Sequence, residues 1–121
     1  MPSARAVVLV VEDEGVVRMG AVDLIQRAGL EAIEAASADE AITILEARRD
    51  IHLVFTDIEM PGTMDGIKLA HYIRERWPPI KLIVASGRSI VEQSSLPEGA
   101  SFFSKPYRDD DLVQSIIKLV A

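Results

Sequence analysis

The chain has 121 residues, a length typical of one compact domain, and 19 acidic against 13 basic side chains give it a net charge of −6. The absence of cysteine excludes disulfides, thiolate metal sites and a cysteine nucleophile. An acidic protein is poorly suited to bind nucleic acid or an anionic membrane, and no apolar run approaches the roughly 20 residues of a membrane span. We therefore expect one cytoplasmic domain over residues 1–121.

Short apolar runs predict five β-strands. The continuous runs at 6–11 and 52–56 are typical of buried strands in a parallel sheet, and the run at 80–85 predicts a further strand. The run at 31–36 alternates with acidic residues and predicts a more exposed strand. A fifth strand is predicted at 100–104.

Helical spacing of apolar residues and typical end signals predict the helices between these strands. Gly29 follows the last apolar position of the first helix, where a left-handed residue ends many helices. Ser37 and Glu40 form the pattern of a capping box, and Asp65 is placed to cap the next helix. The acidic run at 109–111 stands at the start of the last helix, where it favours the helix dipole.

The alternation of strands and helices predicts an α/β fold of the (βα)5 type, with helices on both faces of a doubly wound parallel sheet. The segment at 87–99 is polar and contains Pro97, so we expect the fourth helix to be short or irregular. Ligands of such sheets bind at the carboxyl ends of the strands, which directs attention to the residues there.

Polar side chains follow four of the five predicted strands, and together they indicate phosphoryl transfer. They are Glu12, Asp13 and Glu14 after the first strand, Asp57 after the third, Ser86 after the fourth and Lys105 after the fifth. Clustered carboxylates need a cation, and oxygen ligands with open positions suit Mg²⁺. A carboxylate nucleophile, Mg²⁺, a lysine and a hydroxyl together supply what transfer of a phosphoryl group to a carboxylate requires.

These residues stand in five segments that resemble the receiver domains of bacterial two-component response regulators. The segments are 10–14 (VVEDE), 55–61 (FTDIEMP), 64–66 (MDG), 85–87 (ASG) and 104–106 (SKP). Their order and spacing match, and the resemblance extends over essentially the whole chain. It implies a flavodoxin-like strand order 2-1-3-4-5 and a phosphoacceptor switch in a two-component phosphorelay.

The resemblance also implies a role for each site residue. Asp57 accepts the phosphoryl group, and Lys105, whose bond to Pro106 is typically cis, contacts that group. The implied ligands of Mg²⁺ or Mn²⁺ are Asp13, Asp57 and the backbone carbonyl of Glu59, with Glu12 acting through water. Ser86 and Phe102 are the implied switch residues. The implied residues that set the lifetime of the phosphate are Glu59 and Arg88.

The same resemblance sets the expected partners. The phosphoryl donor is the phosphohistidine of a sensor histidine kinase or of a phosphotransfer protein, and an unidentified protein receives the signal. We expect no direct contact with nucleic acid or membrane, no organic cofactor, and a monomer or weak dimer. The domain is expected to assist its own phosphorylation and dephosphorylation without being an enzyme.

Three features depart from the commonest family pattern. One extra residue lies between Pro61 and Asp65, and the span from Ser86 to Lys105 is shorter than usual. Phe102 stands where tyrosine is frequent, so the switch position lacks a hydroxyl.

Other functions are compatible with parts of the pattern. A phosphatase of the haloacid dehalogenase type would use Asp57 as nucleophile, with Glu59 at the position where such enzymes have an aspartate as general acid and base. These enzymes, however, carry the nucleophile on the first strand and usually have a cap domain. A pseudo-receiver would use the fold for protein contacts alone. A nucleotide or flavin carrier is disfavoured because the first turn is acidic and holds only Gly15. We expect structural roles for His52 and His71, which lack partners at ligand spacing.

Overall fold

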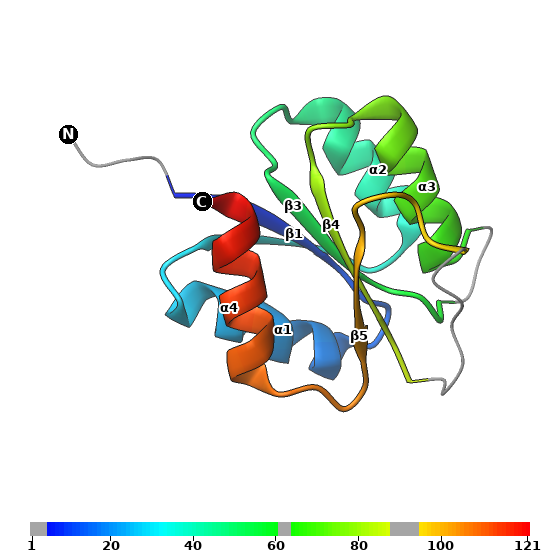
Figure 1. Cartoon of the computed structure of the whole chain (residues 1–121). Coiled ribbons are helices and arrows are strands. Elements are labelled where there is room, and N and C mark those ends of the chain that lie inside the picture. The colour runs from blue at the N-terminus through cyan, green and yellow to red at the C-terminus, as the bar shows by residue number, and fades with distance from the viewer. Residues whose placement is uncertain (1–4, 61–63, 88–94) are drawn as a thin grey trace.

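The computed structural model describes residues 5–60, 64–87 and 95–121 (Figure 1). Its centre is a five-stranded parallel sheet with the strand order β2-β1-β3-β4-β5, as the resemblance implied. The strands are β1 (Val7–Val11), β2 (Glu31–Ala35), β3 (Leu53–Asp57), β4 (Lys81–Ser86) and β5 (Ser101–Ser104). The helices are α1 (Gly15–Arg27), α2 (Ala38–Ala47), α3 (Gly66–Arg76) and α4 (Asp109–Val120).

Helices cover both faces of the sheet, with α1 and α4 on one side and α2 and α3 on the other (Figure 1). Successive side chains of a strand point to opposite faces, so the central strands supply both layers of the core. In β1, Val8 and Val10 pack with α1 and α4, whereas Leu9 and Val11 pack with α2 and α3. This double burial explains why the central strands are continuous apolar runs in the sequence.

The predicted helix ends are confirmed by their hydrogen bonds. Ser37 Oγ accepts a hydrogen bond of 3.1 Å from the backbone N–H of Glu40 at the start of α2. Asp65 Oδ1 accepts one of 2.9 Å from the N–H of Lys68 at the start of α3. Gly29 has a φ of 89°, the left-handed conformation predicted after the first helix.

The two outer strands are less buried than the central ones, as predicted for β2 from its acidic residues. Between β4 and β5, residues 95–100 contain no α-helix, and residues 88–94 lie outside the described part of the chain. The prediction of a short or irregular fourth helix is therefore tested only in part, and residues 61–63, with the extra loop residue, are also outside the described ranges. None of the described helices has the length and apolar character that crossing a membrane requires.

Candidate functional site

The predicted site residues lie at the carboxyl edge of the sheet, each placed by the end of a strand. Glu12 and Asp13 follow β1, and Asp57 is the last residue of β3. Ser86 is the last residue of β4, and Lys105 follows β5. The backbone N–H of Lys105 donates a hydrogen bond of 2.8 Å to the carbonyl of Ser86, which ties the ends of these two strands together. Parallel strands in register thus bring residues from four separate parts of the sequence to one edge.

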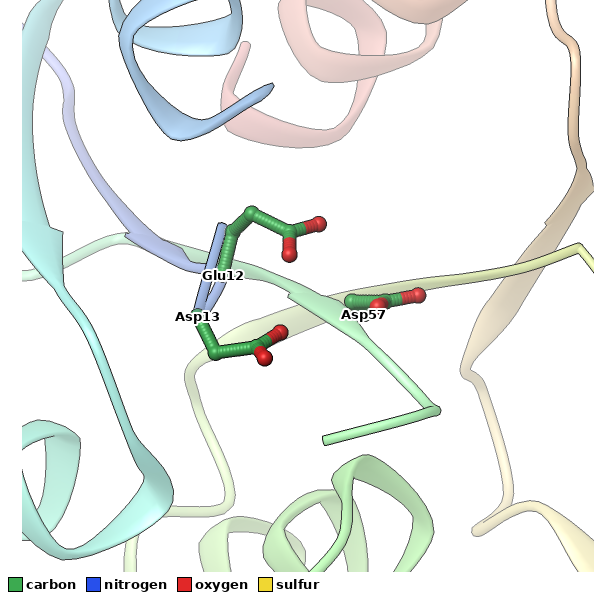
Figure 2. Close-up of side chains that lie close together, drawn as sticks. All are labelled: Glu12, Asp13 and Asp57. Atoms are coloured by element: carbon green, nitrogen blue, oxygen red, sulfur yellow. The ribbon is translucent and has the colours of Figure 1, made fainter. Parts of the chain in front are cut away.

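Three carboxylates form an acidic cluster, which we define as Glu12, Asp13 and Asp57. One oxygen from each lies within 4.8 Å of the others. Figure 2 shows Glu12 and Asp13 next to each other, with their carboxyl groups on the side of Asp57. Glu12 is 6% exposed and Asp57 is 8% exposed, whereas Asp13 is open to solvent. The cluster therefore combines two buried acids with one side that solvent and small ions reach.

Lys105 supplies the one ammonium group in contact with this cluster among the described residues. Its Nζ lies 3.0 Å from Asp57 Oδ1 and 3.6 Å from Glu12 Oε1. Three carboxylates and one ammonium leave an excess of two negative charges at the site when all are ionised. Such an excess close to low-dielectric protein is unfavourable unless a cation compensates it.

The ionisation of these groups reflects this balance. Burial raises the pKa of the Asp57 carboxyl, and the charges of Glu59 and Asp13 add to the increase, while Lys105 opposes it. Burial also raises the pKa of Glu12, with a further contribution from the charge of Asp57. Burial lowers the pKa of Lys105, but its contacts with Asp57 and Glu12 outweigh that effect and raise this pKa above its ordinary value. The acidic cluster is thus under electrostatic strain that a bound cation would relieve.

The donor set fits a hard divalent cation. All of its ligand atoms are carboxylate oxygens, the type that Mg²⁺ and Mn²⁺ prefer. Asp57 Oδ1 is buried, and in the described residues no group donates a well-aligned hydrogen bond to it beyond its ion pair with Lys105. A buried oxygen of this kind retains the capacity to coordinate an ion.

Arg18 holds the backbone next to the acidic cluster in place, a role that no pattern in the sequence predicts. Its Nη1 donates a hydrogen bond of 2.8 Å to the carbonyl of Glu12, and its Nε pairs with Glu34 Oε1 at 2.9 Å. The N–H of Glu14 donates to Glu12 Oε2 at 3.1 Å. These contacts hold the turn after β1 and orient the Glu12 carboxylate. The pairing of Arg18 with Glu34 joins residues 16 positions apart, for which no local pattern exists.

The side chain of Glu59 occupies a position that the sequence did not predict. Its Oε2 accepts a hydrogen bond of 2.6 Å from Ser86 Oγ, and its Oε1 accepts one of 3.0 Å from the N–H of Gly87. The predicted switch hydroxyl of Ser86 is fully buried and donates to Glu59. The predicted ligand role of the Glu59 backbone carbonyl is not tested by any contact and remains a prediction.

Gly66 allows α3 to begin directly against the backbone that carries Asp57. A Cβ at this position would lie 2.1 Å from the carbonyl oxygen of Asp57 and 2.7 Å from the Cα of Ile58. The N–H of Gly66 also donates a hydrogen bond of 3.0 Å to the carbonyl of Ile58. Any side chain at residue 66 would push α3 or the end of β3 out of place. This clash explains why the segment 64–66 ends in a glycine.

Comparison with known proteins decides the family. The model of the response regulator receiver domain family matches residues 8–117. The chain belongs to this family.

Similar proteins agree with the family match. Sensor kinase CckA of Brucella abortus (strain 2308) is 37% identical over 98% of this chain, which spans 13% of that protein. The response regulator receiver protein CpdR of the same organism is 32% identical over 93% of this chain and 95% of its own length. The crystal structure of a response regulator receiver protein from Pseudomonas putida matches with a TM-score of 0.84 and 29% identity, over 97% of this chain and 99% of that one.

The family match confirms the expected receiver fold and the function of the family, a phosphoacceptor switch in two-component signalling. The chain spans only a small part of CckA, so the similarity to that kinase concerns a short segment of it.

Of the other residues that the sequence pointed to, the structure describes Phe102, His52 and His71 but not Arg88. Phe102 is half-buried on β5 and packs on the core layer of α2 and α3. The Lys105–Pro106 bond is cis, as the family resemblance implied, and Arg88 lies outside the described residues. His52 and His71 have the expected structural contacts. Nδ1 of His52 accepts a hydrogen bond of 3.0 Å from a backbone N–H of β1, and Nε2 of His71 lies 2.8 Å from a backbone carbonyl.

Tyr107 is a residue next to the site that the sequence did not single out. Its ring packs edge-on against Phe55 and Phe103, with centroid separations of 6.0 and 5.9 Å. Because it follows Lys105 and Pro106 directly, this packing anchors the turn that carries the lysine. An aromatic residue two positions after a lysine has many uses, so the sequence alone offered no distinguishing signal.

Proposed function

We propose that this receiver domain accepts a phosphoryl group on Asp57 from the phosphohistidine of a sensor histidine kinase or phosphotransfer protein, in a reaction that depends on Mg²⁺. The observation that carries the proposal is the ion pair of 3.0 Å between Asp57 and Lys105, set inside the acidic cluster. Within that cluster Asp57 lies closer to Lys105 than Glu12 does, at 3.0 Å against 3.6 Å. It thus has neighbouring acids to hold a metal and the nearest lysine to contact the phosphoryl group.

In the proposed reaction an oxygen of Asp57 attacks phosphorus and forms an acyl phosphate. The phosphorus–nitrogen bond of the donor breaks, its electron pair stays on the imidazole, and the imidazole nitrogen takes up a proton. Lys105 is placed to neutralise charge on the phosphoryl oxygens because its ammonium group is already within 3.0 Å of Asp57. Asp13, Asp57 and Glu12 would hold the metal, which when bound supplies additional positive charge for the same oxygens.

A surface next to the site supports a protein as the phosphoryl donor. On α1, Val16 is 85% exposed and Met19 is 66% exposed, unusual for large apolar side chains. Val17, also exposed, lines a groove of about 700 Å³ between α1 and the turn that contains Lys105 and Tyr107. We propose that this α1 surface receives the helix that presents the phosphohistidine.

We further propose that residues 1–121 act as one receiver domain in the cytoplasm, as a monomer or weak dimer that signals to a protein partner. The phosphatase alternative lacks support, because both carboxylate oxygens of Glu59 are engaged by Ser86 and Gly87. A general acid would need its carboxyl group available at the reacting phosphate.

Incubation with phosphoramidate and Mg²⁺, followed by intact-mass spectrometry, tests the proposed function. We expect one phosphoryl group on the wild-type protein, none on Asp57→Asn, and little without Mg²⁺ in the presence of EDTA. Equal labelling of Asp57→Asn would contradict the assignment of Asp57. An unlabelled wild-type protein would favour a pseudo-receiver, and sustained hydrolysis of p-nitrophenyl phosphate would favour a phosphatase.

A further inference from the structure

The side chain of Glu59 joins two groups at the end of β4. Ser86 Oγ donates to one carboxylate oxygen at 2.6 Å, and the N–H of Gly87 donates to the other at 3.0 Å. The donors lie 27 and 28 residues along the chain from Glu59, so the contacts connect the loop after β3 to the end of β4. We call this pair of hydrogen bonds the Glu59 latch. Hydrogen bonds that involve a charged partner are shorter and stronger than neutral ones, in agreement with the 2.6 Å distance.

The latch engages the hydroxyl that the family resemblance assigns to the phosphoryl group. The hydroxyl of Ser86 has one proton and can donate to one acceptor at a time. Ser86 is the last residue of β4, and β4 pairs directly with the strand that ends in Asp57. A phosphoryl group on Asp57 would therefore compete with Glu59 for the same proton.

Phosphorylation also changes the charge around Glu59. A phosphoryl group adds roughly −1.5 to −2 charges, and Glu59 lies two residues beyond its attachment point. The carboxylate of Glu59 and the phosphoryl group would repel each other while both attract the Ser86 proton. The two arrangements of Ser86 are thus mutually exclusive, as a two-state switch requires.

We propose that Glu59 is a positioning residue that holds Ser86 and Gly87 in the unphosphorylated arrangement, so that the movement of Ser86 to the phosphoryl group, which the family resemblance implies, requires the loss of its hydrogen bond to Glu59. This inference rests on the proposed function of Asp57 and specifies how the signal leaves that site. When Glu59 no longer accepts the hydrogen bond from the N–H of Gly87, the backbone at the start of the connection between β4 and β5 is released. A receiver without this carboxylate should reach the phosphorylated arrangement more readily.

Removing Glu59 has two effects that a test must separate. It abolishes the latch, and it also removes a negative charge that repels any incoming anion. The charge effect acts whatever residue stands at position 86, whereas the latch acts only through the Ser86 hydroxyl. A double-mutant cycle on Glu59 and Ser86 isolates the part that belongs to the latch.

The cycle uses beryllofluoride with Mg²⁺ as a stable mimic of the phosphoryl group, with affinity measured by calorimetry. We expect Glu59→Ala to tighten binding about tenfold or more in the Ser86 background, because a hydrogen bond to a charged group contributes about that factor. In the Ser86→Ala background the same substitution should tighten binding several-fold less. Equal factors in the two backgrounds would overturn the latch. Glu75→Ala, an exposed acid on α3, changes the net charge equally and should leave the affinity unchanged.

A second measurement needs no phosphoryl mimic. In an amide NMR spectrum, Glu59→Ala should move the Gly87 signal toward the position it takes in beryllofluoride-bound wild-type protein. Glu59→Gln, which keeps one carbonyl acceptor, should give an intermediate position. A Gly87 signal that stays in place in Glu59→Ala would also overturn the latch. Failure of the wild-type protein itself to bind beryllofluoride, with Asp57→Asn behaving identically, would instead overturn the proposed function and this inference with it.

Discussion

Lys105 Nζ lies 3.0 Å from Asp57 Oδ1, which joins the ends of β5 and β3 across the intervening strand β4. The same ammonium group lies 3.6 Å from Glu12 Oε1. One lysine therefore contacts both buried acids of the acidic cluster. This position makes it a counter-charge to both acids, and in the proposed function it would also contact the phosphoryl oxygens on Asp57.

Lys105→Met should slow labelling by phosphoramidate while the protein stays folded. The substitution removes the charge that neutralises the phosphoryl oxygens, and loss of one such group slows comparable reactions by about 10²-fold. Rates are measured by intact mass over time at fixed Mg²⁺. Lys118→Met, on the last turn of α4, is the matched control and should label at the wild-type rate. A Lys105→Met rate equal to that of the control would contradict the proposed role.

The free energy of unfolding should fall as the pH rises above the ordinary pKa values of the buried acids. The folded-state pKa values of Asp57 and Glu12 lie above their ordinary values of 3.8 and 4.5. Between the ordinary and the raised values the unfolded chain binds fewer protons than the folded one, so the stability that is present at low pH is lost as the pH rises. Urea denaturation in EDTA between about pH 4 and pH 8 measures this slope.

Asp57→Asn should make this slope less steep and raise the free energy of unfolding near pH 7 by about 1 kcal/mol. The neutral amide removes a charge for which burial and the neighbouring acids Glu59 and Asp13 together outweigh the ion pair with Lys105. Asp50→Asn provides a contrast because the hydrogen bond from Arg48 lowers the pKa of the exposed Asp50 carboxyl. Asp50→Asn should not raise the free energy of unfolding. An equal change of this free energy in Asp50→Asn and Asp57→Asn would contradict electrostatic strain in the acidic cluster.

Gly66→Ala should destabilise the protein by about 3 kcal/mol or more, because its Cβ would lie 2.1 Å from the Asp57 carbonyl oxygen. Chemical denaturation measures the change. Gly20→Ala, inside α1 with no atom within 4 Å of the new Cβ, should instead stabilise by about 0.5–1 kcal/mol. Similar losses of stability in both variants would show that the close approach of residue 66 to the Asp57 backbone does not determine the effect of the substitution.

Arg18→Ala should weaken Mg²⁺ binding by about tenfold, since groups that orient metal ligands commonly affect metal affinity by 10- to 100-fold. The arginine holds the backbone of Glu12 and reaches Glu34 on β2. Mg²⁺ titration followed by amide NMR measures the affinity. Arg27→Ala removes an exposed ion pair with Asp23 on the same helix and should leave the affinity unchanged. Equal affinities of the two variants would show that the turn after β1 is held without Arg18.

Much of the fold could be predicted because it depends on short-range patterns. The strands at 52–56 and 80–85 begin one residue later in the structure, at Leu53 and Lys81, and end on the polar residues predicted to follow them. The caps at Ser37 and Asp65 depend on contacts three residues apart, which a sequence displays directly. The connection between β4 and β5 was harder to predict, because its polar composition specifies no helix or strand.

The sequence by itself determined that acids, a hydroxyl and a lysine would share one edge, because parallel strands with crossover helices place all their carboxyl ends together. Only the tertiary structure decided which of these groups touch. The contact of Ser86 with Glu59, the close approach of Gly66 to Asp57 and the contact of Arg18 with Glu34 depend on how loops and helices pack across the sheet. Differences of a few tenths of an ångström decide hydrogen bonds, and side-chain packing in three dimensions sets such distances.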